Sequence, residues 1–141
     1  MITAEMLTDN IFVDSFLDES RDRLVYSCRL CVTKLEEMVI PYIPAEAGLF
    51  VYADFSSLLR TKTFEEERRL CAVMVEFAKI VLTPGESQHE EKPGMMRICY
   101  AWVSPEVLAI AMERLSRLVV KLRKMDWSDF NEGTLQSVLE P

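Results

Sequence analysis

Arg97 is the residue whose type and surroundings most favour binding chemistry. It lies in residues 93–103, where alternation of side chains predicts a β-strand with Arg97 on the side opposite to four apolar residues: Met96, Ile98, Tyr100 and Trp102. An unpaired buried guanidinium is costly, so Arg97 must reach an anion or solvent. Its planar fork can hold a carboxylate through two parallel hydrogen bonds. An arginine in a strand can also extend to water or pair with an acid of its own chain.

A Cys-x-x-Cys pair, Cys28 and Cys31, is the other group of reactive residues. On a helix this spacing can serve redox chemistry or half of a metal site. No second pair follows, and the single histidine, His89, lies far along the chain without a nucleophile or a ligand set near it. Cys71 and Cys99 also lie in apolar segments. We therefore expect reduced core thiols, a cytoplasmic setting and no metal site.

The composition limits the class of protein. The chain has 141 residues, of which 50% are hydrophobic, and this is enough for one domain with a core. It carries 23 acidic and 16 basic residues, a net charge of -7, whereas a nucleic-acid binder needs a basic face. No apolar run approaches the roughly 18 residues of a membrane span, and no signal segment is recognisable. We expect neither nucleic acid nor membrane as a partner.

The first element that must position Arg97 is a long amphipathic helix. Apolar residues at intervals of three and four predict it from about residue 8 to residue 39, and Pro41 ends it. About 30 residues at a rise of 1.5 Å give a length of about 45 Å, more than a domain of this size spans. The helix should therefore protrude or bridge to another body.

The remaining elements predict a small two-layer domain. Strands are expected at 49–53, 80–82 and 93–103. Thr63 and Glu66 form a capping box at the start of a helix that runs to about residue 79. Ser104 and Pro105 begin a last helix that ends near Lys124. The fold class is α/β, in the sense of an α+β two-layer domain with a short three- to four-stranded sheet packed on helices.

Four segments follow one another in a recognisable order. They read Ala-Gly-Leu-Phe at 47–50, Thr-Phe-Glu at 63–65, Pro-Gly-Glu-Ser-Gln-His at 84–89 and Pro-Gly-Met-Met-Arg-Ile-Cys-Tyr-Ala at 93–101. The series resembles the C-terminal small domain of the fold-type I pyridoxal-phosphate aminotransferases, and most of all the 1-aminocyclopropane-1-carboxylate (ACC) synthase-like proteins. The resemblance implies that residues 1–40 connect to a large domain, that 41–124 form the small domain, and that 125–141 are a C-terminal tail.

The resemblance also implies roles for individual residues. The arginine of the last motif binds the α-carboxylate of the substrate in this family, and that position is Arg97 here. Ser87 and His89 match the loop motif and are expected to order the loop. Gly48 matches a glycine before a strand and is expected to allow close backbone approach. Departures from the usual ACC synthase residues leave ACC synthase activity and a related aminotransferase activity equally open: Glu86, Met95, Met96 and Trp102.

The lysine that carries the cofactor in this family lies in a Ser-x-Ser-Lys motif upstream of the matched region, and no lysine here has that context. We therefore expect a truncated or fragmentary ACC synthase-like or class I aminotransferase-like protein, inactive alone and without bound cofactor or metal. In the whole enzyme, a cytoplasmic homodimer, pyridoxal phosphate would act at the α-carbon of an amino acid. The alternative is a stand-alone, non-catalytic remnant that serves as an interaction or dimerisation module through its first helix.

Overall fold

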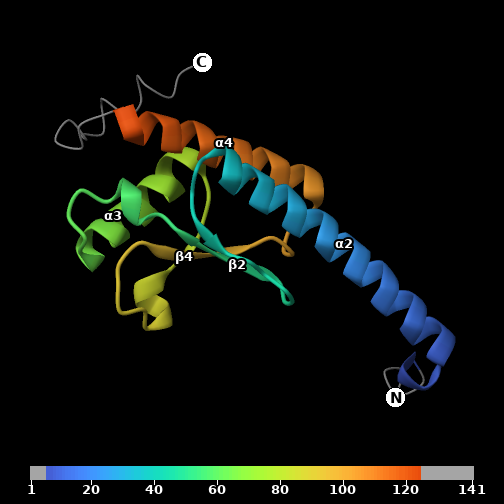
Figure 1. The fold of residues 1–141 in the computed structure, drawn as a ribbon. Helices are drawn as coiled ribbons and strands as arrows, with labels where there is room; N and C mark the ends of the chain where they lie inside the picture. Colours follow the sequence, from blue (N-terminus) through green and yellow to red (C-terminus); the bar gives the residue numbers. More distant parts are fainter. Residues whose placement is uncertain (1–5, 125–141) are drawn as a thin grey trace.

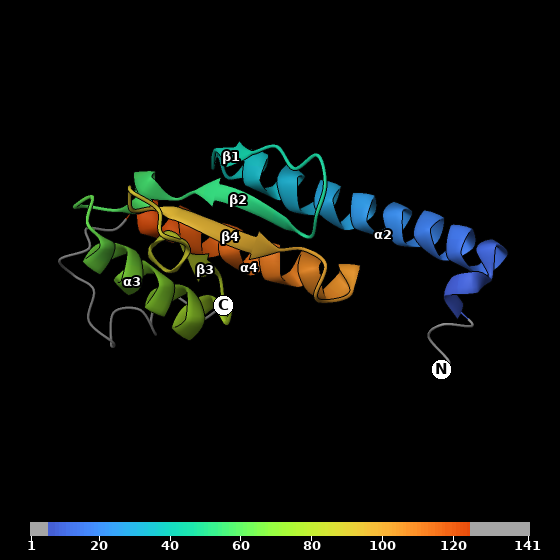
Figure 2. The same ribbon diagram turned by 90° about the horizontal axis from the view of Figure 1, so that it is seen from below.

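The computed structural model describes residues 6–124, so the predicted tail at 125–141 lies outside the described residues. The fold is a two-layer α/β arrangement in which helices pack on one face of an antiparallel sheet (Figures 1 and 2). The main elements in chain order are α2 (Asn10–Glu37), β1 (Tyr42–Ile43), β2 (Phe50–Asp54), α3 (Phe64–Val73), β3 (Thr83–Pro84), β4 (Met95–Cys99) and α4 (Pro105–Lys124). Three short helical segments join them: η1 (Ser56–Leu58), the π-helical η2 (Met74–Ala78) and η3 (Gly85–Gln88).

The sheet of the described chain has the strand order β1-β2-β4-β3, with every neighbouring pair antiparallel. Within it, Arg97 on β4 lies between Tyr52 of β2 and Thr83 of β3. The prediction of a strand at 80–82 is wrong, because the residues that pair with β4 are Thr83 and Pro84. The helical segment η2 ends first, at Lys79, whose φ is 57°. Pro84, which has no N–H, is tolerated because β3 is an edge strand.

The core lies between the helices and one face of the sheet. Val51, Ala53, Met96 and Ile98 point into it, in alternation with half-buried or exposed residues. The last helix, α4, buries Leu108, Leu115, Leu118 and Leu122 against this layer, and Figure 2 shows β4 lying in front of it. The prediction that Trp102 lies on the same face of the strand as Met96 and Ile98 is wrong. The strand β4 ends at Cys99, and the alternation of side chains ends with it. The Trp102 side chain is 87% exposed.

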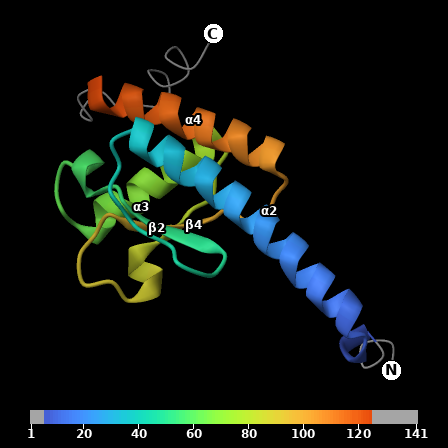
Figure 3. The ribbon, with the colours of Figure 1, turned by 45° about the vertical axis from the view of Figure 1, so that its right-hand side comes forward.

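The helix α2 is longer than the body on which it packs, as the sequence predicts. Asp9 caps it by accepting a hydrogen bond from the Phe12 N–H (3.1 Å). Its buried residues, Ser27, Cys31 and Leu35, all lie in the C-terminal half, and the N-terminal half projects beyond the sheet (Figures 1 and 3). The predicted apolar face is therefore buried only in part. No helix among residues 6–124 is long and apolar enough to cross a membrane.

The predicted capping box at Thr63 forms only in one direction. The Thr63 hydroxyl accepts a hydrogen bond from the Glu66 N–H (3.3 Å), and this begins α3. The reciprocal contact is absent because the Thr63 N–H donates instead to the Thr61 carbonyl (2.8 Å). The Glu66 side chain lies near Arg69, with an N–O distance of 3.6 Å.

The two thiols of the Cys-x-x-Cys pair are free and differ in burial. Cys31 is fully buried, and burial raises its pKa to about 12, whereas Cys28 is half-buried. Only the thiolate is a good nucleophile. We expect iodoacetamide at pH 8 to label Cys28 in the native chain and Cys31 only after unfolding, as measured by peptide mass spectrometry. A Cys28→Ser chain is the control, and rapid native labelling of Cys31 would contradict the expected burial.

Candidate functional site

Arg97 lies on the face of the sheet that no long helix covers. Its guanidinium stacks over the Phe50 ring, with 4.4 Å between the Cζ atom and the ring centroid. One Nη atom donates to the Gln88 side-chain oxygen (3.1 Å), and the other donates to the Thr83 hydroxyl (3.4 Å). The ring fixes the plane of the guanidinium, and the two hydrogen bonds fix its direction within that plane.

The partners of Arg97 are all neutral. Among residues 6–124, no carboxylate forms an ion pair with it, although acidic residues outnumber basic ones in the chain. A guanidinium has more N–H donors than these two contacts use. The arrangement leaves a half-buried, oriented cation that can still bind an anion in a two-pronged manner.

Tyr52 is a neighbour of Arg97 that the sequence analysis did not single out. It pairs with Arg97 across β2 and β4, and its buried hydroxyl faces the Glu90 side chain without a hydrogen bond of good geometry in the described chain. Burial, together with the charge of Glu90, raises its pKa to about 12, so the phenol stays protonated at neutral pH. Alternation within residues 49–53 already places Tyr52 opposite to Val51 and Ala53. The register that brings it to Arg97 is not visible in the sequence.

The predicted loop residues, Ser87 and His89, lie on either side of the residue that contacts Arg97, which is Gln88. The Ser87 hydroxyl donates to the Pro84 carbonyl (2.8 Å). His89 follows η3 with φ 60°, and its N–H donates to the Glu86 carbonyl (3.2 Å). Their expected role in ordering the loop is consistent with these contacts but stays a prediction.

Gly48 is separate from this group, and the close backbone approach predicted for it has no counterpart among residues 6–124. A Cβ atom at Gly48 would meet nothing within 4 Å in the described chain, so no close approach of residues 6–124 requires a glycine there. Its φ of 97° requires one instead, because L-residues with a side chain rarely adopt that conformation. The Gly48 carbonyl accepts a hydrogen bond from the Tyr100 hydroxyl (2.7 Å), which holds the turn before β2.

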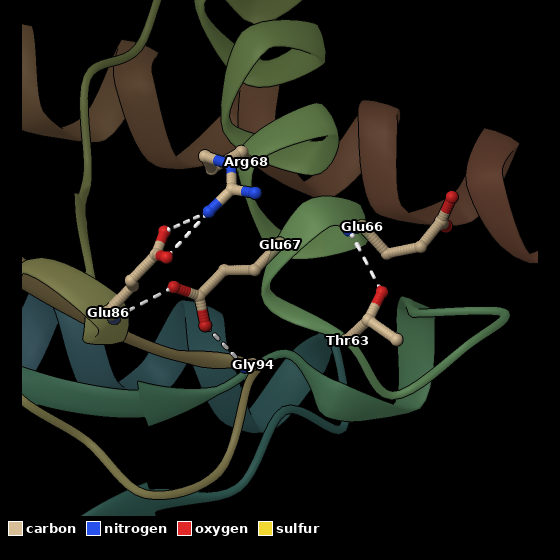
Figure 4. Close-up of polar contacts among 6 residues, drawn as sticks. All are labelled: Thr63, Glu66, Glu67, Arg68, Glu86 and Gly94. Atoms are coloured by element: carbon tan, nitrogen blue, oxygen red, sulfur yellow. Dashed lines mark hydrogen bonds and ion pairs between the residues drawn. The ribbon is translucent and has the colours of Figure 1, made fainter.

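Glu67 is a second residue that the sequence analysis missed. Its side chain is fully buried and accepts hydrogen bonds from the Gly94 N–H (2.6 Å) and the Glu86 N–H (3.0 Å) (Figure 4). The available signal was its position three residues before Leu70 and seven before Met74, on the inner face of the helix. Buried glutamates are rare unless they are paired, so a glutamate on the inner face of a helix indicates a specific hydrogen-bonded contact.

An apolar cavity of about 540 Å³ lies between α2 and the turn at 45–48, and Arg97 does not line it. Tyr100, which shares the inner-face phase of Met96 and Ile98, forms part of its wall. Within residues 6–124 no cluster of histidine, cysteine or acidic side chains can hold a metal ion. The oriented polar groups around Arg97 and the 85–94 loop therefore lie outside this cavity.

Solved aminotransferase structures share this arrangement of helices and strands. An aromatic aminotransferase from Pyrococcus horikoshii matches with a TM-score of 0.74 at 21% identity, over 86% of this chain and 31% of its own. An aspartate aminotransferase from Thermus thermophilus with maleate matches with a TM-score of 0.67 at 23% identity, over 82% and 28% of the two chains. The described chain therefore has the fold of a domain found in aminotransferases.

Sequence comparison identifies the family. Residues 1–115 match the family described as aminotransferase class I and II. The 1-aminocyclopropane-1-carboxylate synthase-like protein 1 of Arabidopsis thaliana is 39% identical over 117 residues, 83% of this chain and 24% of the relative. The ACC synthase of Glycine max is 36% identical over 124 residues, 88% of this chain and 26% of the relative. The chain belongs to the aminotransferase class I and II family, which depends on pyridoxal phosphate. It spans about a quarter of the length of these curated relatives.

None of the lysines in residues 6–124 lies in the buried position that a covalently bound cofactor requires. A lysine that binds the cofactor covalently needs a desolvated position and a neutral amine. Every lysine in residues 6–124 is exposed or half-buried. Lys34 donates a hydrogen bond to Glu37 (2.6 Å), and this contact is the main cause that raises its pKa and keeps it charged.

Addition of pyridoxal phosphate to the purified chain is therefore expected to give no stoichiometric absorbance band of a lysine-bound cofactor. Nα-acetyl-lysine at the same concentration serves as the control for the weak reaction of exposed amines. A band that saturates at one cofactor per chain and survives dialysis would show that a site exists on this chain.

Proposed function

We propose that this domain binds the α-carboxylate of an amino acid substrate through Arg97, as the small domain of an ACC synthase-like, pyridoxal-phosphate-dependent enzyme. The observation that carries the proposal is an arginine that is oriented by Phe50, Gln88 and Thr83 and has no carboxylate partner in the described chain. In a chain with a net charge of -7, an arginine without an acid is available for an external anion.

The role of Arg97 in such an enzyme is orientation. Two parallel hydrogen bonds from one guanidinium fix both the position and the rotation of a bound carboxylate. The carboxylate in turn fixes the α-carbon, whose reacting bond must stand perpendicular to the cofactor ring. The cofactor supplies the electron sink for chemistry at that carbon. Elimination and transamination both need this orientation, so the proposal covers both.

The other parts of the active site would come from a cofactor-binding domain. We assign residues 1–40 to the connection with that domain and residues 41–124 to the carboxylate-binding body. Pyridoxal phosphate and its lysine belong to the partner domain in this proposal. We place the protein in the cytoplasm, where its free cysteines would stay reduced.

A titration of the ¹⁵N-labelled chain with maleate tests the proposal. The Arg97 Nε–Hε signal is expected to move to a saturating value, since a bound carboxylate changes its hydrogen bonding. Sodium chloride at matched ionic strength and the neutral compound succinamide are the controls. A linear, non-saturating shift that sodium chloride reproduces would contradict carboxylate binding at Arg97.

A second candidate function is a non-catalytic dimerisation module, and the exposed N-terminal half of α2 favours it. Ile11 is 85% exposed there, and Phe16 and Leu17 are each 58% exposed. Under the first proposal a cofactor-binding domain covers this surface, whereas under the second a second copy of the chain covers it. Sedimentation velocity distinguishes the two: a dimer that Ile11→Glu converts to a monomer supports the module.

A further inference from the structure

We propose that Glu67 is a positioning residue for Arg97, acting through the loop at 85–94. The inference rests on the proposed function, since it names a residue that sets the orientation of the carboxylate-binding arginine. Glu67 lies on α3, outside the sheet and without direct contact to Arg97 in the described hydrogen bonds. Its influence must therefore pass through the groups that it holds.

The Glu67 carboxylate holds both ends of the loop at once. One oxygen accepts from the N–H of Glu86 at the start of the loop (3.0 Å), and the other accepts from the N–H of Gly94 at its end (2.6 Å) (Figure 4). The side chain is 0% exposed, so water does not compete for either bond. A carboxylate that accepts backbone N–H groups forms stronger bonds than a neutral acceptor does.

The neighbouring residue on α3 strengthens the same attachment. Arg68 forms an ion pair with the Glu86 side chain, with N–O distances of 2.5 and 2.6 Å. Two consecutive residues of α3 thus hold the backbone and the side chain of one loop residue (Figure 4). The Arg68 pair is exposed and contributes little by itself. The buried Glu67 contacts determine the position of the loop.

Both ends of the held segment lead to Arg97. From its first end, η3 carries Gln88, whose side-chain oxygen accepts from Arg97 (3.1 Å). From its second end, Gly94 is followed directly by β4, which carries Arg97. A shift of the loop would therefore tilt the guanidinium plane and move its backbone. Misplacement of a binding group by about 1 Å can cost up to about a hundredfold in rate.

The variant Glu67→Gln tests the inference, because it keeps the shape of the side chain but turns one acceptor into a donor that faces an N–H group. Glu65→Gln is the matched control: it makes the same charge change on an exposed position of the same helix turn. We expect Glu67→Gln to shift the Arg97 Nε–Hε signal in the ligand-free chain and to weaken maleate binding by about tenfold, with no effect from Glu65→Gln. An unchanged Arg97 signal in folded Glu67→Gln would overturn the inference.

A double-mutant cycle separates positioning from general stability. Gln88→Ala should weaken maleate binding in the wild-type chain but add little in the Glu67→Gln chain, because both changes act on the same contact. Fully additive effects would show that Glu67 does not act through Gln88. A wild-type chain that binds no maleate contradicts the proposed function instead, and the ligand-free Arg97 signal still decides the role of Glu67.

If Glu67→Gln does not fold, hydrogen exchange of the wild-type chain supplies the test. The Glu86 and Gly94 amides should show the same protection factor, which is the exchange rate corrected for the intrinsic rate of each residue, since one carboxylate releases both. Gln88→Ala should leave this protection factor unchanged. Protection factors of the two amides that differ by more than about tenfold would show that the loop ends open independently and would overturn the inference.

Discussion

An Arg97→Lys chain is expected to bind maleate at least about tenfold more weakly than the wild-type chain, although its charge is the same. An ammonium group is a point charge and cannot offer a carboxylate two parallel hydrogen bonds from one plane. It also cannot stack as a flat group over Phe50 while it donates to both Gln88 and Thr83. The carboxylate would still be attracted, but it would no longer be oriented.

The measurement follows the Gln88 side-chain amide signals, because the Arg97 signal is lost in the variant. Arg21→Lys on the exposed surface of α2 is the control and should leave the affinity for maleate unchanged. Arg97→Ala should abolish saturable binding. Equal affinity of the Arg97→Lys and wild-type chains would mean that charge alone attracts the anion, and the argument from guanidinium geometry would fail.

Gly94→Ala is expected to lower the free energy of unfolding by at least about 4 kcal/mol. The φ of Gly94 is 111°, a conformation that strains any residue with a side chain. A Cβ atom there would also lie 2.6 Å from the Cα atom and 2.7 Å from the backbone nitrogen of Ser56, and backbone atoms cannot rotate away. Relief of this clash would pull the Gly94 N–H from the buried Glu67 carboxylate.

Gly48→Ala is the matched control for this prediction. Its φ is also strained, but a Cβ atom there meets nothing within 4 Å. Only the backbone strain remains, so we expect a loss of about 1–2 kcal/mol. Urea denaturation of the two variants and the wild-type chain gives both values. Equal losses at the two positions would show that the close approach between Gly94 and Ser56 is not rigid.

Local patterns in the sequence predict the elements of this fold that depend on near neighbours. Apolar spacing predicts α2 and α4, and alternation predicts β4 with Arg97 opposite to Met96 and Ile98. The error at 80–82 arises because Ile80 and Leu82 have strand-like composition but pack as part of the core layer. Apolarity alone does not distinguish a buried connection from a strand.

The surroundings of Arg97 depend on contacts that no local pattern contains. Glu67 reaches backbone groups 19 and 27 residues further along the chain, and Gln88 reaches Arg97 from nine residues before it. Almost every residue type has a backbone N–H group, so the residue type at 86 or 94 does not reveal that a side chain binds the N–H group there. The family motif identified the arginine, and the structure identifies what orients it.

Because α2 packs on the sheet layer only along its C-terminal half, that end is fixed and the N-terminal half projects from the layer as one continuous helix. Arg123 of α4 holds the fixed end by donating hydrogen bonds to the carbonyls of Met38 (2.7 Å) and Val39 (3.2 Å). A rotation of about 5° about Cys31 would displace Asn10, about 32 Å along the axis, by about 3 Å. Any body attached to the projecting end would thereby move relative to the face that bears Arg97, by a distance that the angle of this one helix sets.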